Sequence, residues 1–351
     1  MLRERHTRHA LVPGWQQDRL GAATVVIVGV GALGNAAAQA LALAGVGRLI
    51  LCDPDVVAES NLGRGPLFRG DDVGRPKVLA AAAQLAALAP DVAVDPRVAD
   101  LDGGVGLADL RDAAVVLGCL DNNAARVGLA GRCNLVGACL LDAGTTPWGG
   151  ELRPFLDLEG PCFACGLAPE DRVTRDTPRS CHAGPAALVG ASQPVSALVA
   201  SWQALLAVRV VMGLAVAPER VVIDGAHGRA VRTAGTRDPG CLLHRPLPPA
   251  TRLGLGPGAT VAAVCAAVGE DARVLLWRPA VVGWSCPGGH VTQDSESGVC
   301  SSCGARARAV TTLALAELPP ERTLAQLGVP PREILAVQRG DEFVCVELDA
   351  V

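Results

Sequence analysis

The stretch VVIVGVGALGNAAAQALALAGVGRLILCDPDVVAESNLGRGPLFRGDDVGRPK, residues 25–77, decides the fold of this chain. It opens with a β-branched run, Val25–Val28, which predicts a buried parallel strand. Three glycines in G-x-G-x-x-G spacing follow, and an Ala- and Leu-rich segment, residues 32–44, predicts a helix that ends at Gly45 or Gly47. This order of elements brings bare backbone N–H groups and a positive helix end against a phosphate group. The stretch therefore predicts a nucleotide-binding α/β unit.

The glycine turn alone leaves the class of nucleotide open. Its glycines are Gly29, Gly31 and Gly34. A second apolar strand, residues 49–52, ends at Asp53, where a carboxylate is placed to accept a hydrogen bond from a ribose hydroxyl. A nicotinamide-dependent oxidoreductase shares these features with an enzyme that uses ATP. The residues after Asp53 have to distinguish the two.

Polar and charged side chains crowd the segment after this acid: Asp55, Asn61 and Arg64, followed by Lys77 in the sequence GRPK. Such groups are needed to hold a triphosphate and to neutralise charge during phosphoryl chemistry, whereas an oxidoreductase needs little after its ribose acid. Lys77 is the only lysine in the chain. A compact ammonium can approach phosphate oxygens where a planar guanidinium does not fit. Pro76 suits the first turn of a helix, which places Lys77 near a helix N-terminus.

Further along, a strand predicted at residues 114–117 leads into GCLDNNAAR. Asp121 and Asn122 therefore stand at the carboxyl end of a strand, where open α/β sheets place ligand groups, and the same pair also suits a helix N-cap. Residues 221–233 predict an antiparallel hairpin that completes the sheet. The predicted fold is Rossmann-like, with a mainly parallel sheet and an antiparallel extension. Its other elements are strands at residues 92–94, 138–141 and 150–158 and a helix at residues 107–111.

As a set, these motifs resemble the ThiF/MoeB/HesA family of adenylyltransferases, which are relatives of ubiquitin-activating enzymes. The resemblance runs from about Arg5 to about His244. It implies that Asn61 and Arg64 contact the phosphates of ATP and that Asp121 holds Mg²⁺ on them. The chain departs from the family pattern at Gly65, where the family has a glutamine, at Gly118, where it commonly has another acid, and at His6 and His9 beside Arg8.

The resemblance also implies a substrate and an assembly. The substrate is the C-terminal glycine carboxylate of a small ubiquitin-like or sulfur-carrier protein ending in Gly-Gly, which attacks the α-phosphate of ATP. Arg8, in RHTRHAL, matches an arginine that reaches the ATP of a neighbouring subunit, so a homodimer is expected. Other acceptors stay open: the C-terminus of a short peptide, a small molecule or tRNA. An oxidoreductase or a non-enzymatic scaffold would leave Asn61, Arg64, Lys77 and Asp121 without a role.

Cys181 matches, by resemblance, a family cysteine that precedes a long helix containing Gln-Ala. Its neighbours Arg179 and His182 favour a thiolate, which can form a thioester or an acyl persulfide or disulfide with the activated carboxyl group. A purely structural cysteine is the alternative. The apolar segment that follows, residues 186–217, is long enough to raise the question of a membrane. It carries Ser, Gln, Pro and Arg residues, so we expect a buried helix and no membrane partner.

Thirteen cysteines stand in a chain whose N-terminus lacks the apolar core of a signal peptide. In the cytoplasm, where we place the protein, thiols stay reduced, so close pairs indicate metal rather than disulfides. Two such pairs have two intervening residues each and together form a tetrahedral Cys₃His set for a structural zinc ion: Cys162, Cys165, Cys241 and His244. The family usually has four cysteines here.

The composition of the sequence changes after Arg245, where the Pro- and Gly-rich stretch LPPATRLGLGPGA predicts a linker or loop. We expect an adenylation domain over residues 1–250 and a β-rich accessory domain over 251–351, outside the resemblance, that docks a partner or a dimer mate. It includes strands at 309–315 and 342–348, one helical turn at 324–327, and a zinc-ribbon-like set: Cys286, His290, Cys300 and Cys303. A net charge of −4 does not indicate a nucleic-acid-binding surface, so no nucleic-acid partner is expected.

Overall fold

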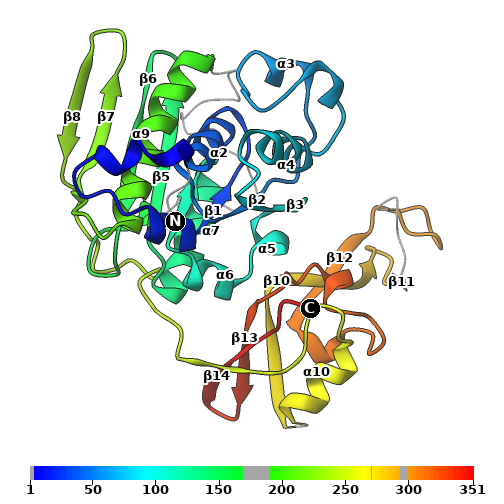
Figure 1. The fold of residues 1–351 in the computed structure, drawn as a ribbon. Helices are drawn as coiled ribbons and strands as arrows, with labels where there is room; N and C mark the ends of the chain where they lie inside the picture. The colour runs from blue at the N-terminus through cyan, green and yellow to red at the C-terminus, as the bar shows by residue number, and fades with distance from the viewer. Residues whose placement is uncertain (1–3, 169–189, 270, 293–298) are drawn as a thin grey trace. The chain divides into compact units, whose positions relative to one another are not determined.

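The computed structural model describes residues 4–168, 190–269, 271–292 and 299–351 (Figure 1). The chain divides into two compact units, Met1–Pro246 and Leu247–Val351. Each unit has its own sheet and its own cluster of buried apolar side chains. The roles expected for residues 1–250 and 251–351 stay predictions.

The larger unit is built on an eight-stranded sheet with the order β3-β2-β1-β4-β5-β6-β7-β8. Strands β3, β2, β1, β4 and β5 pair in parallel, and the remaining three extend the sheet antiparallel. The predicted fold class is therefore confirmed. The bounds are β1 Thr24–Val28, β2 Arg48–Cys52, β3 Ala93–Arg97, β4 Val115–Gly118, β5 Leu140–Thr146, β6 Gly149–Phe155, β7 Arg220–Asp224 and β8 Arg229–Thr233.

Helices cover this sheet because parallel strands need crossover connections. Helix α2 packs against α4 and α9, and α6 packs against α7 (Figure 1). The chain crosses from β3 back to β4, beside β1, so the order of strands reverses between β1 and β4. Ligands of open α/β sheets bind at such a reversal. The helices are α1 Gln17–Ala22, α2 Ala32–Ala44, α3 Glu59–Leu62, α4 Lys77–Leu88, α5 Leu101–Gly104, α6 Leu107–Asp112, α7 Asn123–Val136 and α9 Gln193–Val211.

Helix α9 is the long apolar helix expected within residues 186–217. In the part of the chain that the structure describes, it is the one helix with the length and composition to cross a membrane, and half of its apolar window is buried inside the fold. It packs against α2 and strands β4, β5 and β6. These contacts make it a core helix of the larger unit.

The smaller unit carries a six-stranded sheet in the order β11-β10-β13-β14-β9, with β12 paired to β10. Its core lies between this sheet and α10, which begins after Thr260 with a hydroxyl that accepts from the Ala263 N–H. The predicted linker contains β9, which pairs in parallel with β14. The bounds are β9 Ala250–Arg252, α10 Val261–Val268, β10 Ala272–Ser285, β11 Val291–Thr292, β12 Arg308–Ala314, β13 Ile334–Arg339 and β14 Glu342–Glu347.

Candidate nucleotide and metal sites

The glycine turn after β1 uses its three glycines in different ways. Gly29 has a φ of 89°, and a Cβ there would lie 2.5 Å from the carbonyl oxygen of Cys119. A Cβ on Gly34 would overlap the carbonyl of Gly29. A Cβ on Gly31, which caps α2, would meet nothing within 4 Å. Two glycines therefore permit close packing, while Gly31 keeps the N-terminus of α2 open to a ligand.

Asp53 connects this turn to the only lysine. Its carboxylate accepts hydrogen bonds of 2.7 Å from the Val30 N–H and 2.9 Å from the Asp55 N–H. The Nζ of Lys77 lies 4.0 Å from Asp53 and donates a 2.7 Å hydrogen bond to Asp55. Burial raises the pKa of Asp53, and the ammonium of Lys77 opposes that rise. The acid predicted to contact ribose thus also holds the backbone of the glycine turn.

Lys77 reaches this place because the loop after β2 folds back on itself. Val56 forms a bridge with Pro76, and the Lys77 N–H donates 2.9 Å to the Asp55 carbonyl. Lys77 is the first residue of α4, directly after Pro76, so its predicted place at a helix N-terminus is confirmed. Its side chain is only 10% exposed, which is rare for a lysine and keeps the ammonium close to the turn.

Asn61 and Arg64 lie on the same loop. The Asn61 side chain accepts from the Ala58 N–H at 2.9 Å, so it shapes α3, and its carbonyl accepts from the Arg64 N–H. The Nε of Arg64 is buried without a hydrogen-bond partner among the described residues. Asn35, which no sequence motif marks, accepts a 2.7 Å hydrogen bond from the Leu67 N–H. It ties the loop that carries Arg64 to the first turns of α2.

Asp121 and Asn122 follow β4 on the other side of β1. The Asn122 side chain caps α7 by accepting from the Ala125 N–H at 2.8 Å, and its amide donates 3.1 Å to the Asp121 carboxylate. The predicted helix cap is therefore confirmed. Asp121 is exposed at the carboxyl end of the sheet, which suits a ligand for Mg²⁺. That role stays a prediction.

Arg8 and Cys181 are the two remaining predicted site residues. Arg8 is exposed and precedes a short 3₁₀ helix, His9–Leu11. Cys181 lies outside the described residues. Their roles, at a neighbouring subunit and as a nucleophile, stay predictions.

The first predicted metal set is brought together in the larger unit: Cys162, Cys165, Cys241 and His244, with ligand atoms all within 4.8 Å of one another. The Sγ of Cys162 lies 3.7 Å from that of Cys165 and 3.8 Å from that of Cys241. The Nε2 of His244 lies 3.2 Å from the Cys165 Sγ, and its Nδ1 faces the Leu158 carbonyl at 3.1 Å. A backbone partner on the second ring nitrogen is usual for a metal-binding histidine, so this set fits zinc.

The second predicted set gathers in the smaller unit, between the ends of β10, β11 and β12: Cys286, His290, Cys300 and Cys303. The Cys286 Sγ lies 3.5 Å from the His290 Nδ1 and 3.6 Å from the Cys303 Sγ, and the Cys300 Sγ lies 3.8 Å from the same Nδ1. Two turns hold the pairs, closed by the Gly289 N–H to Cys286 and the Gly304 N–H to Cys300. This donor set also fits zinc.

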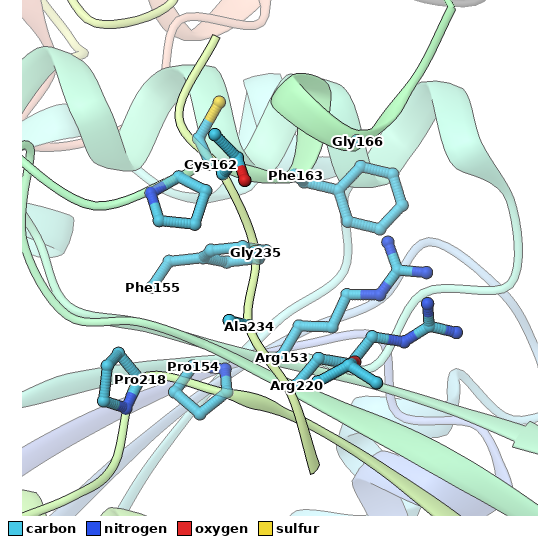
Figure 2. Close-up of a pocket in the computed structure, with 13 residues that line it drawn as sticks. Arg153, Pro154, Phe155, Cys162, Phe163, Gly166, Pro218, Arg220, Ala234 and Gly235 are labelled. Atoms are coloured by element: carbon cyan, nitrogen blue, oxygen red, sulfur yellow. The ribbon is translucent and has the colours of Figure 1, made fainter.

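A cavity of about 170 Å³ lies beside the first cysteine set, between that set and the outer strands. Figure 2 shows Arg153 and Arg220 running side by side, with the ring of Phe163 near the Arg153 guanidinium. Both arginines pair with Glu151, and the Arg153 guanidinium lies 4.9 Å from the Phe163 ring centre. Phe163 follows Cys162 directly. The cavity is therefore lined by Cys162 of the first cysteine set and by charged side chains of β6 and β7, and its lining residues do not include the glycine turn.

The chain belongs to the ThiF family, whose sequence model matches residues 4–243. It is 34% identical over 227 residues to the sulfur carrier protein ThiS adenylyltransferase of Escherichia coli, a match that covers 64% of this chain and 87% of that protein. The molybdopterin-synthase adenylyltransferase of the same species is 33% identical, with 60% and 82% covered. The SAMP-activating enzyme E1 of Haloferax volcanii is 38% identical over 170 residues, with 48% and 62% covered.

Solved structures agree on the fold. The crystal structure of Escherichia coli MccB with ATP is similar with a TM-score of 0.55 at 21% sequence identity, covering 69% of this chain and 74% of that one. The structure of MccB with MccA-N7isoASN gives a TM-score of 0.55 at 20% identity, covering 69% and 75%. At this level of identity the likeness concerns the fold alone. The predicted family is confirmed by the match of the ThiF family model to residues 4–243.

Proposed function

We propose that this chain is an ATP-dependent adenylyltransferase that activates the C-terminal glycine carboxylate of a small ubiquitin-like or sulfur-carrier protein. The observation that carries the proposal is the buried ammonium of Lys77, which lies beside Asp53 and the glycine turn. The Nε of Arg64, which has no hydrogen-bond partner among the described residues, lies on a loop that Asn35 ties to α2, the helix after the glycine turn. A triphosphate needs such cations, and a nicotinamide coenzyme does not. The relatives named above are adenylyltransferases or activating enzymes by name.

The reaction converts a poor acyl donor into a reactive one. A carboxylate oxygen of the carrier attacks the α-phosphorus of ATP, the bond between the α-phosphorus and its bridging oxygen breaks, and pyrophosphate leaves with that electron pair. The product is a mixed anhydride, the carrier's acyl-adenylate. Gly31 and the start of α2 receive the phosphates, and Arg64, Lys77 and Arg8 of the neighbouring subunit balance their charge. Asp121, which accepts a hydrogen bond from the Asn122 amide, would hold Mg²⁺, which supplies further charge neutralisation when bound.

The remaining assignments follow from the same proposal. Both cysteine sets hold structural zinc, because four protein ligands leave no position for a substrate. The protein works as a homodimer in the cytoplasm, where its thiols stay reduced. Cys181 either accepts the activated acyl group or is structural.

ATP–pyrophosphate exchange tests the proposal. Material that co-purifies from the native host is searched by mass spectrometry for a small protein ending in Gly-Gly, and that protein is added to the exchange reaction. We expect exchange that depends on ATP, Mg²⁺ and the free C-terminal carboxylate. Exchange supported only by a short peptide or a small molecule would change the acceptor. Stabilisation by NAD and none by ATP in a thermal-shift titration would overturn the proposal.

A further inference from the structure

Arg126, on α7, is a buried arginine whose guanidinium donates hydrogen bonds to the turn that carries Asp121. Only 3% of the residue is exposed. Its Nε and Nη2 donate hydrogen bonds of 3.0 Å and 2.8 Å to the carbonyl of Leu120, the residue directly before Asp121. Two charged N–H donors that converge on one carbonyl oxygen hold that oxygen in place.

Arg126 is itself fixed by the neighbouring strand β5. Its Nη1 donates a 2.9 Å hydrogen bond to the carboxylate of Asp142, and its Nη2 donates 3.0 Å to the Ala143 carbonyl. Both side chains of the ion pair are 2% exposed. A buried charge pair with well-directed hydrogen bonds resists displacement, because either charge left alone would be buried without compensation. The guanidinium thus clamps the turn after β4 to strand β5.

Gly118 makes room for this clamp. A Cβ at Gly118 would lie 2.8 Å from the Oδ1 of Asp142, so a side chain there would displace the carboxylate. The family resemblance leads to the expectation of an acid at position 118. In this chain a carboxylate reaches the same space from β5 instead.

We propose that Arg126, locked by Asp142, is a positioning residue that sets the carboxylate of Asp121 for the Mg²⁺ of the nucleotide. Arg126 holds the backbone before Asp121, and the Asn122 amide donates a 3.1 Å hydrogen bond to the Asp121 carboxylate. The inference rests on the proposed function, because it assigns Asp121 a place beside ATP. It adds two residues, on α7 and β5, that touch no substrate.

The first test compares two conservative variants on the same helix. Arg126→Lys keeps the charge and loses the two converging donors, whereas Arg132→Lys changes a buried arginine that donates 2.7 Å to the Val105 carbonyl, in a different contact. The dissociation constant of ATP is measured for the full chain with Mg²⁺ and with EDTA. We expect Arg126→Lys to reduce the Mg²⁺-dependent gain in affinity at least about tenfold, and Arg132→Lys to keep it. Equal gains in both variants would overturn the proposal.

A second test moves the carboxylate between strands. Asp142→Ala should lose the Mg²⁺-dependent gain, and adding Gly118→Asp should recover it, because the Cβ of the new side chain would lie 2.8 Å from the place of the Asp142 Oδ1. A double variant that stays folded by circular dichroism without recovery would overturn the proposal. Wild-type protein that binds no ATP would instead refute the proposed function, so the two failures are distinguishable.

Discussion

Lys77 has two carboxylate partners at the proposed nucleotide site. Its ammonium donates to Asp55, whose side chain is 64% exposed, and lies 4.0 Å from the buried Asp53. An exposed carboxylate is a weak partner in water, so phosphate oxygens can replace Asp55 without leaving a buried charge alone. The side chain is therefore held in place before a nucleotide binds and is free to change partners when one does.

Replacing this ammonium should remove a contact made to the phosphates in the transition state. We expect Lys77→Ala to lower ATP–pyrophosphate exchange by roughly 100-fold, which corresponds to ~3 kcal/mol. Arg75→Ala is the matched control, because Arg75 lies two residues earlier, is half exposed and pairs with Asp72 at 2.6 Å. Exchange in the control should stay within about twofold of wild type. Wild-type-like exchange in Lys77→Ala would remove this residue from the mechanism.

The Asp142–Arg126 pair should give ATP binding a dependence on pH. Burial raises the pKa of Asp142 from 3.8 to about 6, opposed by Arg126 and Arg153 and assisted by Glu151. The folded protein therefore holds this proton more tightly than the unfolded chain, and the group's contribution to stability falls as pH rises from 3.8 to about 6. The ion pair itself is present above about pH 6 and is lost as pH falls through that value.

We therefore expect the Mg²⁺-dependent gain in ATP affinity to weaken below about pH 6 in wild type, following the pKa of Asp142. Asp142→Asn removes the titrating group, so its profile should lack this transition. Protonation of ATP itself affects both proteins equally, and the difference between the two titrations isolates the pair. Parallel profiles would show that Asp142 does not titrate in this range.

At the scale of the elements, local signals predicted some boundaries well and others poorly. Helix α2 has the predicted bounds, and it ends where Gly45 adopts a φ of 86°. Strand β5 continues to Thr146, beyond the predicted residue 141, because it pairs with β6 through residues that lack an apolar pattern. Strand β10 was not predicted, since its 14 residues include a proline, and its register shifts along β12.

The residues of the candidate site also differ in how far the sequence alone could identify them. Gly29, Asp53, Lys77 and Asp121 were recognisable because their chemistry is carried by type and spacing in the sequence. Arg126 and Asn35 were not, because both act on backbone groups of residues that are remote in the sequence, Leu120 aside. Spacing reveals side chains that share a ligand, whereas contacts with carbonyl and N–H groups depend on the folded chain.

The two cysteine sets should bind zinc independently of each other, because each set joins its own pair of chain segments. We expect two zinc ions per chain in wild type, one in Cys165→Ser and one in Cys303→Ser, since each variant loses a ligand of a different set. Cys265→Ala is the control, because this half-buried thiol belongs to neither set. Elemental analysis by mass spectrometry measures the zinc content. Two ions retained in Cys165→Ser would contradict the assignment of the first set.

At the scale of the whole molecule, the family match covers the larger unit and does not include the smaller unit. The match ends at residue 243, and the smaller unit begins at Leu247. All residues proposed to contact ATP therefore belong to the larger unit. The smaller unit has its own core and its own candidate zinc site, so the contacts that stabilise its fold are separate from those of the larger unit.

The homodimer makes the last prediction, because Arg8 is exposed and is proposed to serve the partner's nucleotide. Arg8→Ala and Lys77→Ala should each be nearly inactive alone. In a mixed dimer, the subunit with Arg8→Ala keeps its own Lys77 and receives Arg8 from its partner, so one of the two sites is complete. Random pairing makes half of the dimers mixed, and exchange should recover to about a quarter of wild type. If Arg8 acts within its own subunit, mixing restores nothing, and the active unit is then a single chain.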